Sequence, residues 1–151
     1  MERDNLIARL SLDFALRIVK LRKYLSETKN EYILSKQILR SGTSIGANIY
    51  ESEHAQSKDD FLAKLYISLK EANETKYWLE LLHLSDYIDD NQYESIINDL
   101  GKIIGTLVNI IKKTNQYNFG DRNDTVSGTY SQEDEYFKND SQGYIIDRKT
   151  G

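Results

Sequence analysis

Hydrophobic residues recur every three or four positions along most of the chain, which is the period of an amphipathic α-helix. The first stretch predicts a helix from Asp4 to Ser26 and a turn at residues 28–30. Its apolar stripe consists of Leu6, Leu10, Phe14, Ile18, Leu21 and Leu25. A second helix is expected from Glu31 to Ala55. Its inner side would hold Leu34, Ile38, Gly42, Ile45 and Ile49.

Two further helices follow from capping signals and the same period. Ser57 is typical of an N-cap whose hydroxyl accepts from the N–H of Asp60, and it predicts a third helix over Lys58–Ser85. Asp89 or Asp90 would begin a fourth that ends near Thr114. Its inward residues would be Tyr93, Ile96, Ile97, Leu100, Ile104, Leu107 and Ile111. Short connections predict an all-α, up-down-up-down antiparallel four-helix bundle.

The bundle is expected to occupy residues 1–117, because the pattern breaks after Tyr117. Residues 118–151 are rich in Gly, Asn, Asp and Ser, which predicts a polar, mobile tail. This segment holds 4 basic and 7 acidic residues of the chain's 20 and 24, so the bundle holds 16 and 17. Docking of the tail on the bundle or a partner is the alternative, since it carries aromatic residues: Tyr130, Tyr136, Phe137 and Tyr144.

The third helix carries apolar residues on more than one face. One seam, spaced like a coiled coil, would fill the bundle core; it consists of Phe61, Leu65, Ser68, Ala72, Thr75, Leu79 and Leu82. Further apolar residues lie outside it: Leu62, Ile67, Leu69, Trp78 and Leu81. A monomeric bundle has no second core for them, so they predict an oligomer interface with other copies of the chain. The alternative is that they flank one wide core stripe.

Small residues on two helices predict close helix packing. Gly42 and Gly46 lie in the second helix and Gly101 and Gly105 in the fourth, where each glycine costs roughly 1 kcal/mol relative to alanine. The segment SGTSIG lacks the strand and the lysine of a Walker motif, which argues against a nucleotide site.

Catalytic and metal chemistry are not expected. The chain has no cysteine, so thiolate ligands and nucleophiles are excluded. Glu51 with His54 and Glu80 with His83 resemble halves of a di-iron site, but antiparallel helices would separate the two histidines by about 39 Å. No arginine precedes a histidine with the spacing of HEPN-type ribonucleases. We therefore expect no enzyme, no metal and no cofactor.

A charged N-terminal start without an apolar core, and no run long enough to span a bilayer, predict a cytoplasmic protein that does not enter a membrane.

Polar residues between the second and third helices predict a semi-buried network that fixes the register of the helices. Its expected members on the second helix are Arg40, Ser44, Asn48 and Glu51, and those on the third are Ser68, Glu71 and Thr75.

Basic residues dominate the first two helices, and part of them share one face as in a phosphate-binding stripe. The candidate nucleic-acid contacts are Arg9, Arg17, Lys20, Arg22, Lys23, Lys36 and Arg40. An ordinary solvated helix face is the alternative for a single chain. Assembly would favour binding, because each copy repeats the stripe and phosphate contacts add.

Two segments resemble a known family: FALRIVKL, from Phe14 to Leu21, and LSKQILRSGTSIGANIYESEHAQSKDDFLAKLYISLKEANETKYWLELL, from Leu34 to Leu82. The chain resembles the four-helix-bundle proteins encoded in intervening sequences of 23S ribosomal RNA genes. Within that family it is similar to the accessory variability determinants of diversity-generating retroelements. The resemblance covers roughly residues 6–113, and SGTSIGAN and SLKEANETKYWLELL are its most specific blocks.

This resemblance implies a non-catalytic, homopentameric ring of bundles that binds RNA or DNA through basic surfaces. It also implies a reverse transcriptase as partner, in mutagenic synthesis of complementary DNA. A scaffold that binds only proteins is the alternative, and the near-neutral bundle favours it. An enzyme that processes ribosomal RNA is disfavoured, because the chain lacks an acid, base and nucleophile constellation.

Overall fold

The computed structural model describes residues 5–119. These residues form four helices and no strand: α1 (Leu6–Glu27), α2 (Leu34–Ser52), α3 (Lys58–Leu84) and α4 (Asp90–Phe119). The expected all-α class is confirmed, and the helix order is consistent with a four-helix bundle. The predicted tail, with its aromatic residues, lies outside the described residues.

The chain divides into two compact units, residues 1–103 and residues 104–151. The first contains α1, α2, α3 and the beginning of α4. The described part of the second continues α4, in which Leu107 and Ile111 are buried.

The first turn of the chain shows why α2 begins later than predicted. Asn30 has a φ of 56°, a left-handed conformation that asparagine tolerates well, and it reverses the chain after α1. The buried carboxylate of Glu31 then accepts hydrogen bonds from the N–H groups of Leu34 at 2.9 Å and Ser35 at 2.7 Å. Glu31 is therefore a cap outside the helix and not its first residue.

The other helix starts also have side-chain caps. The Ser57 hydroxyl accepts from the N–H of Asp60 at 3.0 Å, as the sequence predicted. At α4, Asp89 Oδ1 accepts from the N–H of Gln92 while Gln92 Oε1 accepts from the N–H of Asp89, both at 2.8 Å. This reciprocal pair is a capping box with an acidic first residue.

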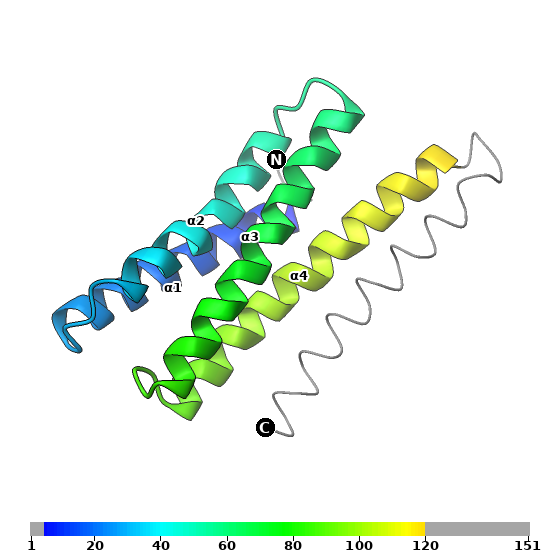
Figure 1. The fold of residues 1–151 in the computed structure, drawn as a ribbon. Helices are drawn as coiled ribbons and strands as arrows, with labels where there is room; N and C mark the ends of the chain where they lie inside the picture. Colours follow the sequence, from blue (N-terminus) through cyan, green and yellow to red (C-terminus); the bar gives the residue numbers. More distant parts are fainter. Residues whose placement is uncertain (1–4, 120–151) are drawn as a thin grey trace. The chain divides into compact units, whose positions relative to one another are not determined.

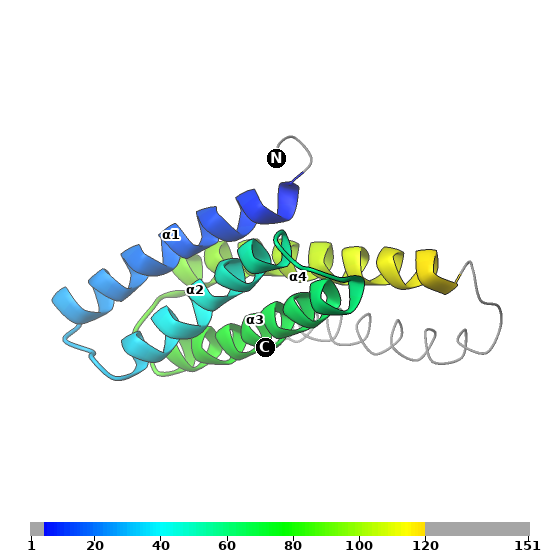
Figure 2. The same cartoon turned by 90° about the horizontal axis from the view of Figure 1, so that it is seen from above.

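Within the first unit, α2 packs against both α1 and α3, and the three helices lie side by side (Figures 1 and 2). The centre is filled by Phe14 and Ile18 from α1 and by similar residues from α2 and α3. The predicted inner residues Ile38, Ile45, Ile49, Leu65, Ala72, Leu79 and Leu82 are all buried. Phe61, which was expected in the same seam, is only half-buried.

The glycine prediction is confirmed for α2 and wrong for α4. A Cβ built on Gly42 would lie 2.8 Å from Cγ1 of Ile18, and one on Gly46 would lie 3.3 Å from Oγ of Ser11. The α1 and α2 backbones therefore approach closely. Apart from the chain neighbours and the nearby backbone of the same helix, no atom of the described chain lies within 4 Å of a Cβ built on Gly101 or Gly105.

A polar network joins α2 to α3. The hydroxyl of Ser68 donates to the carbonyl of Ile45 at 2.9 Å, and that of Thr75 donates to the hydroxyl of Ser41 at 2.8 Å. Ser44 does not reach α3; its carbonyl accepts from the Asn48 side chain one turn further along α2. The network exists, but Ser41 occupies the place expected for Ser44.

None of the helices formed by residues 5–119 combines the length and the apolar character that crossing a membrane requires.

Candidate functional site

The outward face of α1 carries large apolar side chains that the first unit does not bury. Leu12 is 62% exposed, Leu16 is 55% exposed and Val19 is 39% exposed. They follow one another by four and three residues, so they form one continuous ridge on the helix. We call Leu12, Leu16 and Val19 the α1 ridge. Isolated exposed leucines are ordinary, but a contiguous row of them indicates a binding surface.

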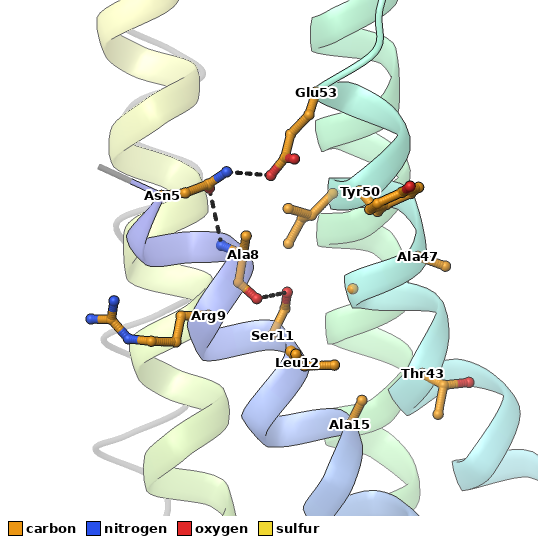
Figure 3. A pocket seen from close by; sticks show the side chains of 12 residues that line it. Asn5, Ala8, Arg9, Ser11, Leu12, Ala15, Thr43, Ala47, Tyr50 and Glu53 are labelled. Carbon is orange, nitrogen blue, oxygen red and sulfur yellow. Dashed lines mark hydrogen bonds between the residues drawn. The ribbon is translucent and has the colours of Figure 1, made fainter. Parts of the chain in front are cut away.

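A groove of about 620 Å³ runs beside the ridge, between α1 and α2. Leu12 and Ala15 of α1 and Ala47 and Tyr50 of α2 line it, and Figure 3 shows Leu12 extending toward α2. Gly46 and Ala8 also line the groove, and their small size leaves this space open.

One end of the groove is polar. The Asn5 amide donates to the Glu53 carboxylate, which links the start of α1 to the residue after α2 (Figure 3). Asn5 also caps α1 by accepting from the N–H of Ala8 at 3.3 Å. Deeper in the groove, the Ser11 hydroxyl donates to the Ala8 carbonyl at 3.1 Å. The groove thus has an apolar length and a hydrogen-bonded end.

Tyr50 is the most prominent side chain on the α2 side. It is 66% exposed, and its ring lies 5.1 Å from the ring of His54 at a tilt of 47°. Tyr50 lines the groove and also a second hollow that contains His54 and Lys64. An aromatic ring is therefore available at the edge between the two hollows.

Two of the predicted basic contacts are occupied by neighbouring helices. The Arg17 guanidinium donates to Asp99 Oδ2 at 2.8 Å and to Ser95 Oγ at 3.0 Å, both on α4. The Arg40 guanidinium pairs with Glu71 at 3.3 Å and with Glu74, both on α3. Each arginine joins two helices, which is not visible in a one-dimensional charge pattern.

Arg22 is half-buried, and its Nε has no hydrogen-bond partner within the described chain.

The other four predicted contacts are exposed: Arg9, Lys20, Lys23 and Lys36. None of them forms an ion pair or side-chain hydrogen bond with another residue in the range 5–119. Three of these cations lie on α1 with the ridge, alongside two exposed carboxylates, Asp13 and Glu27. The face is therefore mixed in charge, with an excess of basic groups.

The five predicted interface residues of α3 have different surroundings. Leu69 is 5% exposed, so it is already buried within its own chain and offers almost no surface to a partner. Ile67 is 40% exposed, and Leu62, Trp78 and Leu81 are half-buried. The Trp78 indole donates to Glu74 at 3.0 Å, the same carboxylate that pairs with Arg40. Their role in an interface stays a prediction.

The two histidines lie in separate environments. The ring of His54 is tilted against that of Tyr50. His83 Nε2 lies 2.7 Å from Asp90 Oδ1, and the His83 ring stacks on Tyr93 with 4.3 Å between the ring centroids. Among residues 5–119, no group of three His, Cys, Asp or Glu side chains is placed to hold a metal ion.

No binding role was predicted from the sequence for the α1 ridge or for Tyr50. A signal was present, because Leu12, Leu16 and Val19 repeat at helical spacing beside the stripe that was assigned to the core. Their exposure could not be known before the face of α1 that meets α2 was determined.

Comparison with known proteins assigns the chain to a family. The model of the family described as 23S rRNA-intervening sequence protein matches residues 3–109. A crystal structure from Bacteroides thetaiotaomicron VPI-5482, of a protein of unknown function from the S23 ribosomal protein family, is 60% identical in sequence. The match covers 72% of this chain and 97% of that chain, with a TM-score of 0.71. No curated protein was found to match the chain.

Proposed function

Because the chain belongs to the 23S rRNA-intervening sequence protein family, we propose that it is a non-enzymatic accessory protein that binds nucleic acid. In this proposal it assembles into a homopentameric ring and works in the cytoplasm with the reverse transcriptase of a retroelement. Its role there is to support mutagenic synthesis of complementary DNA. The family membership is the premise, and the geometry of α1 supplies the physical argument.

The observation that carries nucleic-acid binding is the row of exposed cations on α1. Arg9, Lys20 and Lys23 are exposed and make no ion pair with another residue between 5 and 119. A cation without a protein partner keeps its full capacity to bind phosphate, whereas Arg17 and Arg40 would first have to break their present hydrogen bonds. Lys36 adds a further cation on α2.

Assembly strengthens this proposal. A ring repeats the cations of one copy on every other copy, and contacts with phosphate add because each one releases condensed counterions. Ile67 on α3, which is 40% exposed, lies on an apolar surface available for assembly or for a reverse transcriptase.

No catalytic activity is part of the proposal. Hydrolysis of RNA requires a general base and a group that stabilises the transition state. The proposal assigns the exposed groups of the α1 face to binding, with the lysines and the arginine in contact with phosphate.

Fluorescence anisotropy with labelled RNA over a salt series tests the proposal. The variant Lys20→Glu/Lys23→Glu should bind more weakly at every salt concentration, since it places repulsive charge on the proposed surface. Replacing the two lysines by neutral residues should reduce the slope of log affinity against log salt concentration. The slope should fall by about one for each lysine–phosphate contact that is lost in each subunit bound to RNA. Lys70→Glu, on the exposed side of α3, is the matched control and should bind as the wild type does. Weak binding that is equal in all three proteins contradicts the proposal.

A scaffold that binds only proteins is the second candidate. The α1 ridge favours it, because Leu12 and Leu16 provide apolar area that a phosphate backbone does not use. The two candidates differ in the anisotropy experiment: a scaffold gives no salt-dependent RNA binding but still retains its assembly mass.

A further inference from the structure

The α1–α2 groove and the α1 ridge are not explained by contacts to phosphate. Cations suffice for such contacts, yet this face combines them with Leu12, Leu16 and an exposed Tyr50 beside an open groove. A ligand that matches the whole face must offer anionic groups and apolar flat surfaces at the same time.

We propose that this face binds single-stranded nucleic acid, with the phosphates along the outer side of α1 and unpaired bases over the ridge and in the groove. One base stacks on the ring of Tyr50. The inference rests on the proposed function and specifies the form of nucleic acid and the residues that contact its bases.

The directions of the side chains separate a backbone track from a base track. In Figure 3, Arg9 extends from α1 away from α2, whereas Leu12 extends toward α2. Lys20 follows Arg9 by 11 residues, close to three helical turns, and Lys23 lies about one turn further on, so the three cations follow one side of α1. A strand running along α1 would meet cations on its outer side and apolar groups on its inner side.

The groove accommodates a base in size and chemistry. Its volume of about 620 Å³ exceeds that of one nucleobase. The small side chains of Ala8, Ala15 and Ala47 line it and leave this space open. Tyr50 at its edge is 66% exposed, which leaves ring surface available for stacking. Aromatic side chains contribute to single-strand binding in this way without selecting a sequence, because every base has a flat π face.

A double helix fits this face less well. Its bases are stacked inside, its outer surface is mainly phosphate and sugar, and the major groove of an RNA duplex is too deep and narrow for side chains to read. Leu12 and Leu16 would then lie against a charged backbone without apolar contact. A single strand instead presents both its phosphates and its base faces.

Charge also favours a polyanion over a second copy of the chain. The outward side of α1 carries Arg9, Lys20 and Lys23 against two carboxylates, Asp13 and Glu27, and a third carboxylate, Glu53, lies at the polar end of the groove, where it accepts from the Asn5 amide. The same face of a second copy would bring the same excess of positive charge. A nucleic acid brings the opposite charge.

The decisive experiment compares three labelled RNA probes of equal length: a single strand, the same strand with abasic sites throughout, and a blunt duplex. The wild-type protein should bind the intact single strand more tightly than the other two. Tyr50→Ala should weaken binding to the intact single strand by about 5- to 150-fold, the range expected for one stacked base. Its affinity for the abasic strand and the duplex should not change. Tyr77→Ala is the matched control, since Tyr77 is another exposed tyrosine, on α3.

Three results would overturn the inference while leaving nucleic-acid binding intact: equal wild-type affinity for the intact and abasic strands, preference for the duplex, or no effect of Tyr50→Ala. Light scattering provides a fourth test, because a lower assembly mass for Tyr50→Ala would identify a second copy as the occupant of the groove. Failure of all three probes to bind would instead contradict the proposed function itself.

Discussion

Gly42 of α2 lies directly against Ile18 of α1: a Cβ at Gly42 would be 2.8, 3.0 and 3.1 Å from three side-chain carbons of Ile18. Ile18 is fully buried and β-branched, so it has little freedom to move aside. This contact explains why a glycine occupies the middle of a helix, where it lowers helix propensity.

Gly42→Ala should therefore destabilise the protein. Overpacking costs about 1 to 3 kcal/mol and, with three close contacts, outweighs the roughly 1 kcal/mol gained in helix propensity. Gly105→Ala is the matched control and should raise stability by up to about 1 kcal/mol, because no described atom outside the surrounding helix backbone lies within 4 Å of the added methyl group. Urea denaturation measures both. Changes of the same sign in the two variants would contradict the packing argument.

Arg17 and Lys20 should have opposite effects on stability and binding. Arg17→Ala removes the hydrogen bonds from α1 to Ser95 and Asp99 and should lower the free energy of unfolding by up to about 1 kcal/mol. The loss is small because the Arg17 and Asp99 side chains are 39% and 41% exposed. Lys20→Ala should leave stability unchanged, since Lys20 has no partner between residues 5 and 119.

In RNA binding the order of the two variants should be reversed. Lys20→Ala should weaken binding and reduce the salt slope by about one per engaged subunit, whereas Arg17→Ala should have the smaller effect. Anisotropy and thermal melting on the same preparations decide the point. A larger loss of RNA affinity in Arg17→Ala would mean that Arg17 leaves α4 to contact the ligand.

Glu31 should be important for stability although it lies between helices. Its buried carboxylate accepts from the N–H groups of Ile33, Leu34 and Ser35, which would otherwise be unpaired at the start of α2. Glu31→Ala should cost about 1 to 2 kcal/mol by removing this cap. Glu31→Gln retains one acceptor oxygen and should fall between wild type and alanine in chemical denaturation. An unchanged midpoint for Glu31→Ala would show that water replaces the carboxylate at no cost.

Trp78→Ala should cost less than the roughly 3 kcal/mol typical of a fully buried tryptophan, because Trp78 is half-buried. Trp78→Phe preserves most of the packing but removes the N–H that donates to Glu74. If the α3 face is an oligomer interface, Trp78→Ala should also lower the assembly mass measured by light scattering. Unchanged mass together with unchanged melting would identify an exposed side chain without a role.

The helical period and the capping residues were sufficient to predict the four helices, because both act within a few residues of the chain. The hydroxyl of Ser57 caps α3 wherever that helix packs, and the i, i+3, i+4 pattern of α2 determines which side is apolar. The start of α2 was misplaced because the role of Glu31 depends on a side-chain conformation that reaches forward to the N–H groups of Leu34 and Ser35.

The candidate site depended on contacts between residues far apart in sequence. Arg17 and Lys20 look equivalent as members of one basic run, yet only Arg17 forms an ion pair with Asp99, because the beginning of α4 lies on that side of α1. Likewise, α1 has apolar residues around much of its circumference, and the pattern alone could not show which of them α2 covers. Local periodicity and capping therefore specify the helices and their apolar sides. The packing of α1 against α2 and the contacts of Arg17 with Ser95 and Asp99 establish which leucines and which cations remain exposed, because burial and ion pairing are properties of pairs of surfaces.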